Sequence, residues 1–284
     1  MSTLHVLGNG FDLNHGLPTR YDPDLKDLAI QGERFEGEWE SYSIGADLWS
    51  SVEQQLAYPD VDIILDHLGN YSPDLSSDRE SDRDSIIHEA EQLLAFPLEV
   101  FAENADEKLE TTKPDAKFVN LFRPDDFFLT FNYTHTLERL YGVPSSRVLH
   151  LHGEVGVSQL IIGYEPGALR GVASLDQYDD EENYEHYQSR AYDAVKRRLA
   201  AFEKLYQHQA LNDFVKRIAH APDRIVVFGH SLGSVDRPYF ESLARQYPDT
   251  RWTLCAHREG ALNVVCAAFD AYRLDVPYDV RVLR

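Results

Sequence analysis

The sequence predicts an α/β protein with a doubly wound, mostly parallel, Rossmann-like sheet that carries helical insertions. Short apolar runs indicate buried strands, because most are too short to be helices, and longer segments with helical spacing lie between them. Strands that alternate with helices favour a parallel sheet covered on both faces. The predicted strands are residues 4–7, 127–131, 147–151, 160–162, 224–228, 251–255 and 280–283.

The helical segments cover residues 46–57 around Trp49, 84–101, about 188–219 and 236–246. Two polar stretches, residues 71–83 and the acidic, tyrosine-rich run 176–185, are predicted to be solvated loops. The sequence shows neither an internal repeat nor a low-complexity tail. We therefore expect one domain over residues 1–284, with helical insertions at about 24–115 and 170–220.

The composition narrows the class of protein. The 43% of apolar residues can build a substantial core, whereas a formal charge of −21 disfavours nucleic acid and anionic lipid as partners. The first residues lack a basic region, and no run reaches the roughly 18 to 20 apolar residues of a membrane span, so we expect no membrane association. Cys255 and Cys266 are too few for a disulfide framework or a structural zinc site, which favours the reducing cytoplasm.

Small or polar clusters directly follow four of the predicted strands. In open α/β sheets, ligands bind outside the carboxyl ends of the strands, where the strand order reverses. Four clusters at such ends therefore predict the position of the functional site. They are residues 8–12 (GNGFD), 132–134 (NYT), 152–153 (HG) and 229–232 (GHSL).

The first cluster has glycines that let a backbone approach a ligand closely. Gly8 and Gly10 open a dinucleotide-like pattern, but Leu13 stands where the third glycine of G-x-G-x-x-G would be, so an ordinary strand-to-helix turn is the alternative. Backbone N–H groups of such a turn can hold phosphate despite the acidic net charge. Asp12 is expected either to accept a ribose hydroxyl or to cap the next helix.

The second cluster places Thr130 and Asn132 two residues apart and hence on one face of a continuing strand. The Asn132 amide offers a donor and an acceptor that suit a water or a sugar hydroxyl, and an Asx turn is the alternative. His135 and Glu138 are expected to be ordinary helix residues.

In the third cluster, His150 and His152 have the period of two that points both side chains the same way. No third ligand with suitable spacing accompanies them, so a metal site is the less favoured interpretation. His152 stands before Gly153 at the mouth of the strand, where a histidine can act as a general base.

Together with Gly233, the fourth cluster matches the nucleophile elbow G-x-S-x-G, and Ser231 is the serine of that motif. A serine esterase would then need an acid and a histidine downstream, and Asp249 and His257 have the right order. The chain between them is short for the strands and helices of an α/β-hydrolase, so this function is an alternative.

The order of these motifs and the residues in them resemble the AbiH family of bacteriophage abortive-infection proteins. That family is itself similar to the sirtuin-like, NAD-using fold. The matching segments span most of the chain. They are residues 7–13 (LGNGFDL), 16–19 (GLPT), Trp49 and Glu53, 129–134 (LTFNYT), 150–153 (HLHG), and 229–232 (GHSL) with Asp236.

The resemblance implies a role for each motif. Gly8 and Gly10 would line the nucleotide phosphates, Asn132 and His152 would face the nicotinamide ribose as the catalytic pair, and Ser231 would be a ligand contact on the adenosine side. Thr134 stands where the acidic residue of the sirtuin-like pattern is usual, and the zinc module of the deacylases has no cysteines to build it. The expected nucleotide-contacting residues are Gly8, Asn9, Gly10, Phe11, Asp12, Thr130, Gly229, His230, Ser231 and Asp236.

The resemblance thus implies an NAD⁺ glycohydrolase that acts in abortive-infection defence against phage. The enzyme would use NAD⁺ or a related nucleotide as substrate, with no prosthetic group and no metal, and a homo-oligomer is compatible with the sequence. A non-catalytic sensor of NAD⁺ or an ADP-ribose derivative is the second hypothesis. The serine esterase centred on Ser231 is the third.

Overall fold

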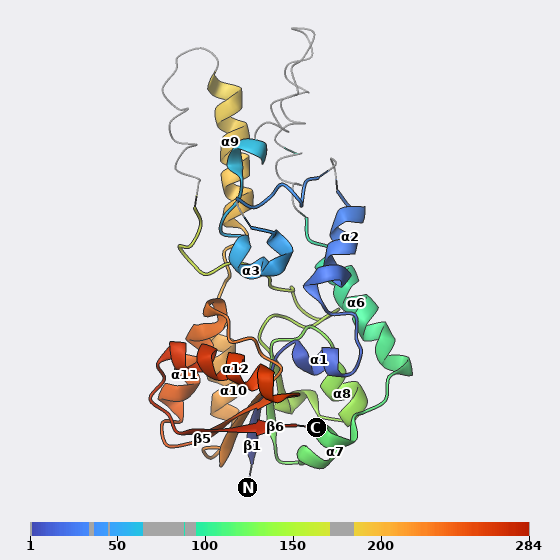
Figure 1. Cartoon of the computed structure of the whole chain (residues 1–284), viewed down its shortest axis with the longest axis vertical. Helices are drawn as coiled ribbons and strands as arrows, with labels where there is room; N and C mark the ends of the chain where they lie inside the picture. The colour runs from blue at the N-terminus through green and yellow to red at the C-terminus, as the bar shows by residue number, and fades with distance from the viewer. Residues whose placement is uncertain are drawn as a thin grey trace. The chain divides into compact units, whose positions relative to one another are not determined.

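The computed structural model describes residues 2–33, 37–44, 46–64, 88, 95–170 and 185–283 (Figure 1). Two compact units divide the chain. The first comprises Met1–Arg20, Leu98–Ile161 and Tyr206–Arg284, and the second comprises Tyr21–Pro97 and Ile162–Leu205. The ranges of the second unit overlap the two insertions that the sequence predicts.

The first unit contains a six-stranded sheet in which every neighbouring pair is parallel. The strand order is β3-β2-β1-β4-β5-β6, which is the Rossmann order with its switch point between β1 and β4. The predicted doubly wound fold is therefore confirmed. The strands are β1 Thr3–Leu7, β2 Phe127–Thr130, β3 Val148–His150, β4 Arg224–Phe228, β5 Arg251–Ala256 and β6 Tyr278–Val282.

Helices cover both faces of this sheet (Figure 1). On one face, α10, α11 and α12 pack against alternate strand residues such as Leu4, Ile225 and Trp252. On the other face, α1, α7 and α8 pack against Leu7 and Phe128. The helices of this unit are α1 Gly10–Asn14, α6 Leu98–Lys108, α7 Ala116–Leu121, α8 Thr136–Tyr141, α10 His208–Arg217, α11 Arg237–Gln246 and α12 Glu259–Tyr272, with 3-10 turns η3 Leu109–Thr111, η4 Ser145–Arg147 and η6 Ser234–Asp236.

The second unit has an aromatic core of its own. Trp39 lies 5.9 Å from Trp49 and 4.4 Å from Phe96, measured between ring centroids. Lys204 is buried and forms a 2.6 Å ion pair with Glu53. The elements of this unit are the π-helical turn η1 Tyr21–Leu25, α2 Lys26–Gln31, the 3-10 turn η2 Leu48–Ser50, α3 Val52–Gln55 and α9 Glu185–Ala200.

Six of the seven predicted strands exist, and the exception is residues 160–162. This segment is apolar because Leu160 is buried, but Ile161 donates to the carbonyl of His152 in the loop after β3 and the segment joins no strand. The apolar run therefore reflects packing beside the sheet edge.

Helical segments were predicted with less accurate limits. The predicted helix 46–57 is a 3-10 turn and the short α3, which meet at Ser51. The predicted helix 188–219 is divided between α9 and α10. Helix α12 was missed because its sequence is too uniformly apolar to show one polar face. The predicted loop 71–83, most of 176–185 and most of the predicted helix 84–101 lie outside the described residues.

The switch point is closed by backbone contacts between the loops after β1 and β4. The Gly8 N–H donates to the Phe228 carbonyl at 3.0 Å, and the Gly10 N–H donates to the Gly229 carbonyl at 2.8 Å. A Cβ built on Gly10 would lie 2.6 Å from the Gly229 Cα, and Gly229 itself has a φ of +69°. Glycine at these positions is therefore required for the two backbones to touch.

We predict that Gly10→Ala lowers the free energy of unfolding by about 1–3 kcal/mol, because the new methyl group has only backbone to displace. Gly260→Ala in α12 is the matched control: its Cβ would meet open space, so stability should stay unchanged or rise by about 0.5–1 kcal/mol. Urea unfolding of both variants measures the difference. Equal stability of the two variants would contradict the packing requirement.

Candidate functional site

The carboxyl ends of four adjacent strands lie level with one another. Leu7 pairs in register with Thr130 on one side and Phe228 on the other, and Thr130 pairs with His150. The loops that follow β1, β2, β3 and β4 therefore meet at one edge of the sheet. This edge holds all four motifs that the sequence analysis selected.

The glycine turn after β1 offers fewer ligand donors than its sequence suggests. Gly8, Gly10 and Phe11 each donate their N–H to a carbonyl of the protein, whereas the Asn9 N–H makes no hydrogen bond with a described residue. The Asn9 side chain donates to the Thr19 carbonyl at 2.6 Å and fixes the turn. Phe11 is only 1% exposed, so its expected contact with a nucleotide is wrong: the ring packs against Phe118 in the core.

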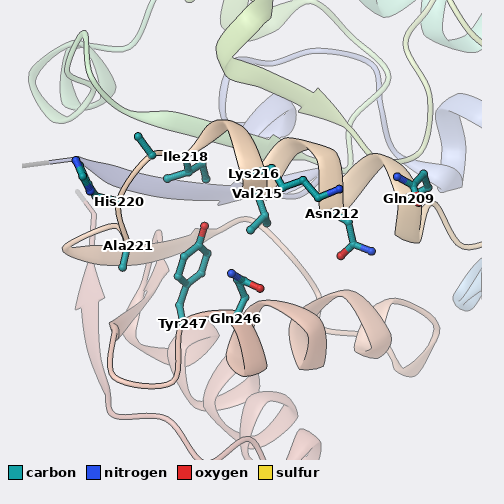
Figure 2. Close-up of a pocket in the computed structure, with 10 residues that line it drawn as sticks. Gln209, Asn212, Val215, Lys216, Ile218, His220, Ala221, Gln246 and Tyr247 are labelled. Carbon is teal, nitrogen blue, oxygen red and sulfur yellow. The ribbon is translucent and has the colours of Figure 1, made fainter.

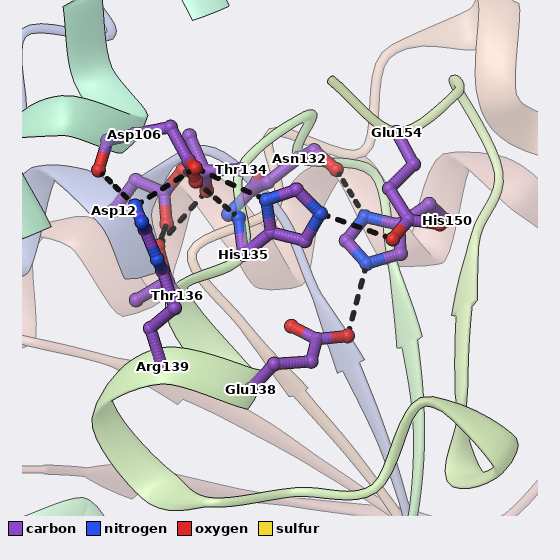
Figure 3. A network of polar contacts seen from close by, with 10 residues as sticks. All are labelled: Asp12, Asp106, Asn132, Thr134, His135, Thr136, Glu138, Arg139, His150 and Glu154. Atoms are coloured by element: carbon purple, nitrogen blue, oxygen red, sulfur yellow. Dashed lines mark hydrogen bonds and ion pairs between the residues drawn. The ribbon is translucent and has the colours of Figure 1, made fainter. Parts of the chain in front are cut away.

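Asp12 lies on the buried side of α1 and accepts two hydroxyl hydrogen bonds (Figure 3). The Thr134 hydroxyl donates to it at 2.6 Å and the Thr136 hydroxyl at 2.8 Å. Asp12 is 1% exposed and makes no side-chain cap, so neither role expected for it, a helix cap or a ribose contact, matches the structure. Thr134, which stands where an acidic residue is usual in the sirtuin-like pattern, is thus hydrogen-bonded to an acid on helix α1.

Asn132 is held by its backbone while part of its side chain stays unsatisfied. Its N–H donates to the Thr130 hydroxyl at 3.1 Å, and its carbonyl is 3.0 Å from Nδ1 of His150. The side-chain Nδ2 is buried and makes no hydrogen bond of normal geometry within the described structure, although the Asn132 side chain is close enough to Asp12 to lower the pKa of that carboxyl group. Buried amide donors are nearly always satisfied in proteins, so this group is suited to a ligand or a water.

His150 and His135 belong to a cluster of carboxylates that the sequence did not predict (Figure 3). His150 Nε2 lies 3.3 Å from Glu138, and His135 lies 3.1 Å from both Asp106 and Glu154. The hydrogen bond to Asp106 raises the pKa of His135. Burial, the largest single cause, would lower the pKa of His150, but the contacts with Glu138, the Asn132 carbonyl and Glu154 together outweigh it and the pKa is raised. His135 and Glu138 are therefore not the ordinary helix residues that we expected.

His152 lies in a different network from His150. Strand β3 ends at His150, so the period of two does not continue and the expectation of a shared direction is wrong. His152 Nε2 lies 3.0 Å from one oxygen of Asp236, and His230 Nε2 lies 3.2 Å from the other. The ring centroid of Phe131 is 5.0 Å from that of His152 and 4.3 Å from that of His230. Asp236 therefore bridges the two imidazoles inside the protein.

The hydrogen bonds determine the tautomers of both imidazoles. The Leu232 N–H donates to Nδ1 of His230 at 2.8 Å, so that nitrogen is an acceptor and the proton is on Nε2, which lies 3.2 Å from Asp236. His230 is 6% exposed, much like His152 and Asn132, but both of its nitrogens face protein groups, so the nucleotide contact expected of this residue stays a prediction. His152 donates Nε2–H to Asp236, but its Nδ1 bonds to no described residue and keeps a basic lone pair.

Ser231 is exposed in the loop after β4, and its proposed partners lie elsewhere. Asp249 precedes β5 and His257 follows it, so about 20 Å or more of extended strand separates them. The helix after the serine begins only at Arg237, which differs from the immediate strand–turn–helix of a nucleophile elbow. These three residues therefore do not assemble an esterase triad.

Within the described residues, no group of three or more His, Cys, Asp or Glu side chains is arranged to hold a metal ion. The same residues include no helix that is long and apolar enough to cross a membrane.

The fold and the site define a doubly wound α/β protein with a buried histidine–carboxylate pair at the switch edge of its sheet. A family model described as "Bacteriophage abortive infection AbiH" matches residues 4–256, and the chain belongs to this family. Membership implies a role in abortive infection by phage. Comparisons with curated proteins and with solved structures find no match.

We predict that Asp12 makes stability depend on pH. Burial raises the pKa of Asp12 from 3.8 to about 6. The folded protein thus binds this proton more tightly than the unfolded chain, so the stability that the proton contributes is complete below about pH 4 and is lost as the pH rises through about 6. The pKa difference corresponds to about 3 kcal/mol.

Relative to Asp12→Asn, the wild-type protein should therefore lose up to about 3 kcal/mol of unfolding free energy between pH 4 and 7. Urea unfolding of both proteins at pH values across this range makes the comparison. Parallel pH curves would contradict the prediction.

Proposed function

We propose that the protein is an NAD⁺ glycohydrolase that cleaves the nicotinamide–ribose bond and acts in this way during abortive infection. The defence role follows from the family. The reaction and its substrate are our proposal, and they extend the resemblance to the sirtuin-like fold.

The observation that carries the proposal is the tautomer of His152, which leaves Nδ1 as a hydrogen-bond acceptor. Asp236 holds its Nε2–H, which leaves Nδ1 as an acceptor that no described residue occupies. A histidine fixed in this way by a buried carboxylate can accept a proton as a general base. The unsatisfied Nδ2 of Asn132, in the loop after the neighbouring strand, supplies a donor that can orient a reactant.

The chemistry of NAD⁺ suits such a site. Nicotinamide leaves as a neutral molecule, because its ring nitrogen takes the electron pair of the breaking bond to the ribose C1′. No acid is needed for the leaving group, in contrast to an ordinary glycoside. Water then forms the new C1′–O bond and gives its proton to Nδ1 of His152. Alternatively, His152 accepts a proton from a ribose hydroxyl while Asn132 orients the water.

Binding of the diphosphate would rely on the turn after β1. Because Gly8 and Gly10 donate to the β4 loop, the Asn9 N–H is the donor in this turn that a phosphate oxygen can use. The exposed Ser231 and the neighbouring Gly229 are available for the adenosine side. Thr130 acts indirectly, because its buried hydroxyl supports the backbone of Asn132.

We predict that the purified protein releases nicotinamide and ADP-ribose from NAD⁺. His152→Ala and Asn132→Ala should each lower the rate by about 10²–10⁴, the usual contribution of a general base or an orienting group. His220→Ala, which removes an exposed histidine, is the matched control and should leave the rate unchanged. Chromatography of the products measures the rates, and circular dichroism verifies that the variants are folded.

The outcome separates the hypotheses. Tight binding of NAD⁺ without release of nicotinamide would refute the glycohydrolase and favour the sensor. Absence of both binding and release would remove NAD⁺ as the ligand.

We further predict that Asp236→Asn lowers kcat by about 10²-fold or more and changes KM little, since Asp236 orients His152 without being exposed to substrate. An amide can no longer accept from both imidazoles as a carboxylate does, so the tautomer of His152 is lost. Steady-state kinetics at several pH values provides the test. An equal rise in KM with unchanged kcat would instead assign Asp236 to substrate binding.

A further inference from the structure

A cavity in the first unit lies over one face of the sheet and also reaches Cys255 and Val282, near the carboxyl ends of β5 and β6. Its volume is about 800 Å³, which is within the range of pockets for small molecules. Its floor is the sheet face opposite α10, α11 and α12, where His5, Val226 and Thr253 lie side by side on β1, β4 and β5. It extends to Thr3 and Arg224, which are the first residues of their strands.

Cations surround this cavity in an otherwise acidic chain. Lys117 and Arg123 come from α7 and the loop after it, and Arg224 and Arg281 come from β4 and β6, whereas Asp223 is the one acid in its lining among the described residues. The whole chain has 48 acids against 27 basic residues, so chance would favour carboxylates here.

Two of these cations are already neutralised within the protein. Lys117 lies 3.2 Å from Asp115, and Arg224 lies 3.0 Å from Asp279.

The other two, Arg123 and Arg281, are exposed and form no hydrogen bond or ion pair through their side chains with any described residue. They contribute the uncompensated charge of the cavity and are free to bind an anion.

The floor of the cavity holds an unused polar atom. His5 is 1% exposed, and its Nε2 lies 2.9 Å from Asp126. Its Nδ1 is buried without a partner within the described structure. A buried nitrogen in this state costs free energy unless a ligand or a water satisfies it. Because Nε2–H donates to Asp126, this Nδ1 is a buried acceptor below the floor, and the free guanidinium groups at the rim are the part of the cavity that can bind an anion.

We propose that this basic cavity binds a phosphorylated small molecule of about the size of a nucleotide. Guanidinium groups form paired hydrogen bonds with phosphate oxygens, and two arginines from different elements can share one diphosphate. The site is separate from His152 and Asn132 in the fold, so the proposal does not rest on the glycohydrolase activity. Such a ligand would act as an effector or as a second substrate of this protein.

Inorganic pyrophosphate is the probe, titrated into the full-length protein by calorimetry at low ionic strength. The wild-type protein should bind it. Arg123→Gln combined with Arg281→Gln should abolish detectable binding, and His152→Ala should leave the affinity unchanged because that residue belongs to the carboxyl edge.

An isosteric pair of variants controls for charge and for folding. Asn120→Asp adds one negative charge to an exposed residue that lines the cavity and should weaken binding about tenfold by repulsion. Asn212→Asp adds the same charge on α10, at a smaller cavity of about 440 Å³ whose walls also include Gln246 and Tyr247 (Figure 2). This second variant should change the affinity by less than about twofold, because its charge is remote from the proposed site.

Failure of the wild-type protein to bind pyrophosphate would overturn the proposal. Equal weakening by Asn120→Asp and Asn212→Asp would also overturn it, because net charge would then be the cause. Loss of binding in His152→Ala would assign the phosphate to the carboxyl edge and exclude the proposed basic cavity as its site. None of these results depends on release of nicotinamide.

Discussion

The direct contact between the backbones after β1 and β4 is the constraint on which the site depends. Gly8, Gly10 and Gly229 let the two loops approach with no Cβ between them, and hydrogen bonds then fix the loops to each other. A Rossmann sheet usually leaves its ligand crevice at this point. In this protein Asn132 and His152 lie in the loops after β2 and β3. The glycine contact fixes the neighbouring loops after β1 and β4 to each other.

Buried carboxylates organise the rest of that edge. Asp12 holds two threonine hydroxyls, Glu138 holds His150, and Asp236 holds His152 and His230. Asp12 is 122 and 124 residues from its two threonine partners, and Asp236 is 84 residues from His152. Glu138 is only 12 residues from His150. A carboxylate inside a protein is costly unless hydrogen-bonded, so these acids fix the side chains around them. His152 and Asn132 both retain side-chain groups that face no protein partner in the described residues, as do one oxygen of Glu138 and the Asn9 N–H. The proposed reaction centres on His152 and Asn132 because they supply a proton acceptor and a hydrogen-bond donor.

Charged side chains are arranged differently at the carboxyl edge of the sheet and in the basic cavity over one sheet face. At the carboxyl edge, acids are paired with histidines and hydroxyls inside the protein. On the sheet face opposite α10, α11 and α12, four cations line a cavity that the helices of the first unit leave open. A chain that repels phosphate backbones as a whole can therefore still hold a small anion locally.

The sequence by itself determined the fold class, because strand-length apolar runs and helical periodicity are local properties that depend on burial. It also indicated that the four motifs meet at one edge of the sheet, since each motif directly follows a predicted strand and the carboxyl ends of neighbouring parallel strands lie together. The roles of Asp12, Asp236 and Glu138 depended on tertiary structure, because each acid has a partner in another element or loop of the fold and no local pattern records such pairs. The same reason separated His150 from His152: the sequence gives their spacing, and the end of β3 decides the direction of each ring.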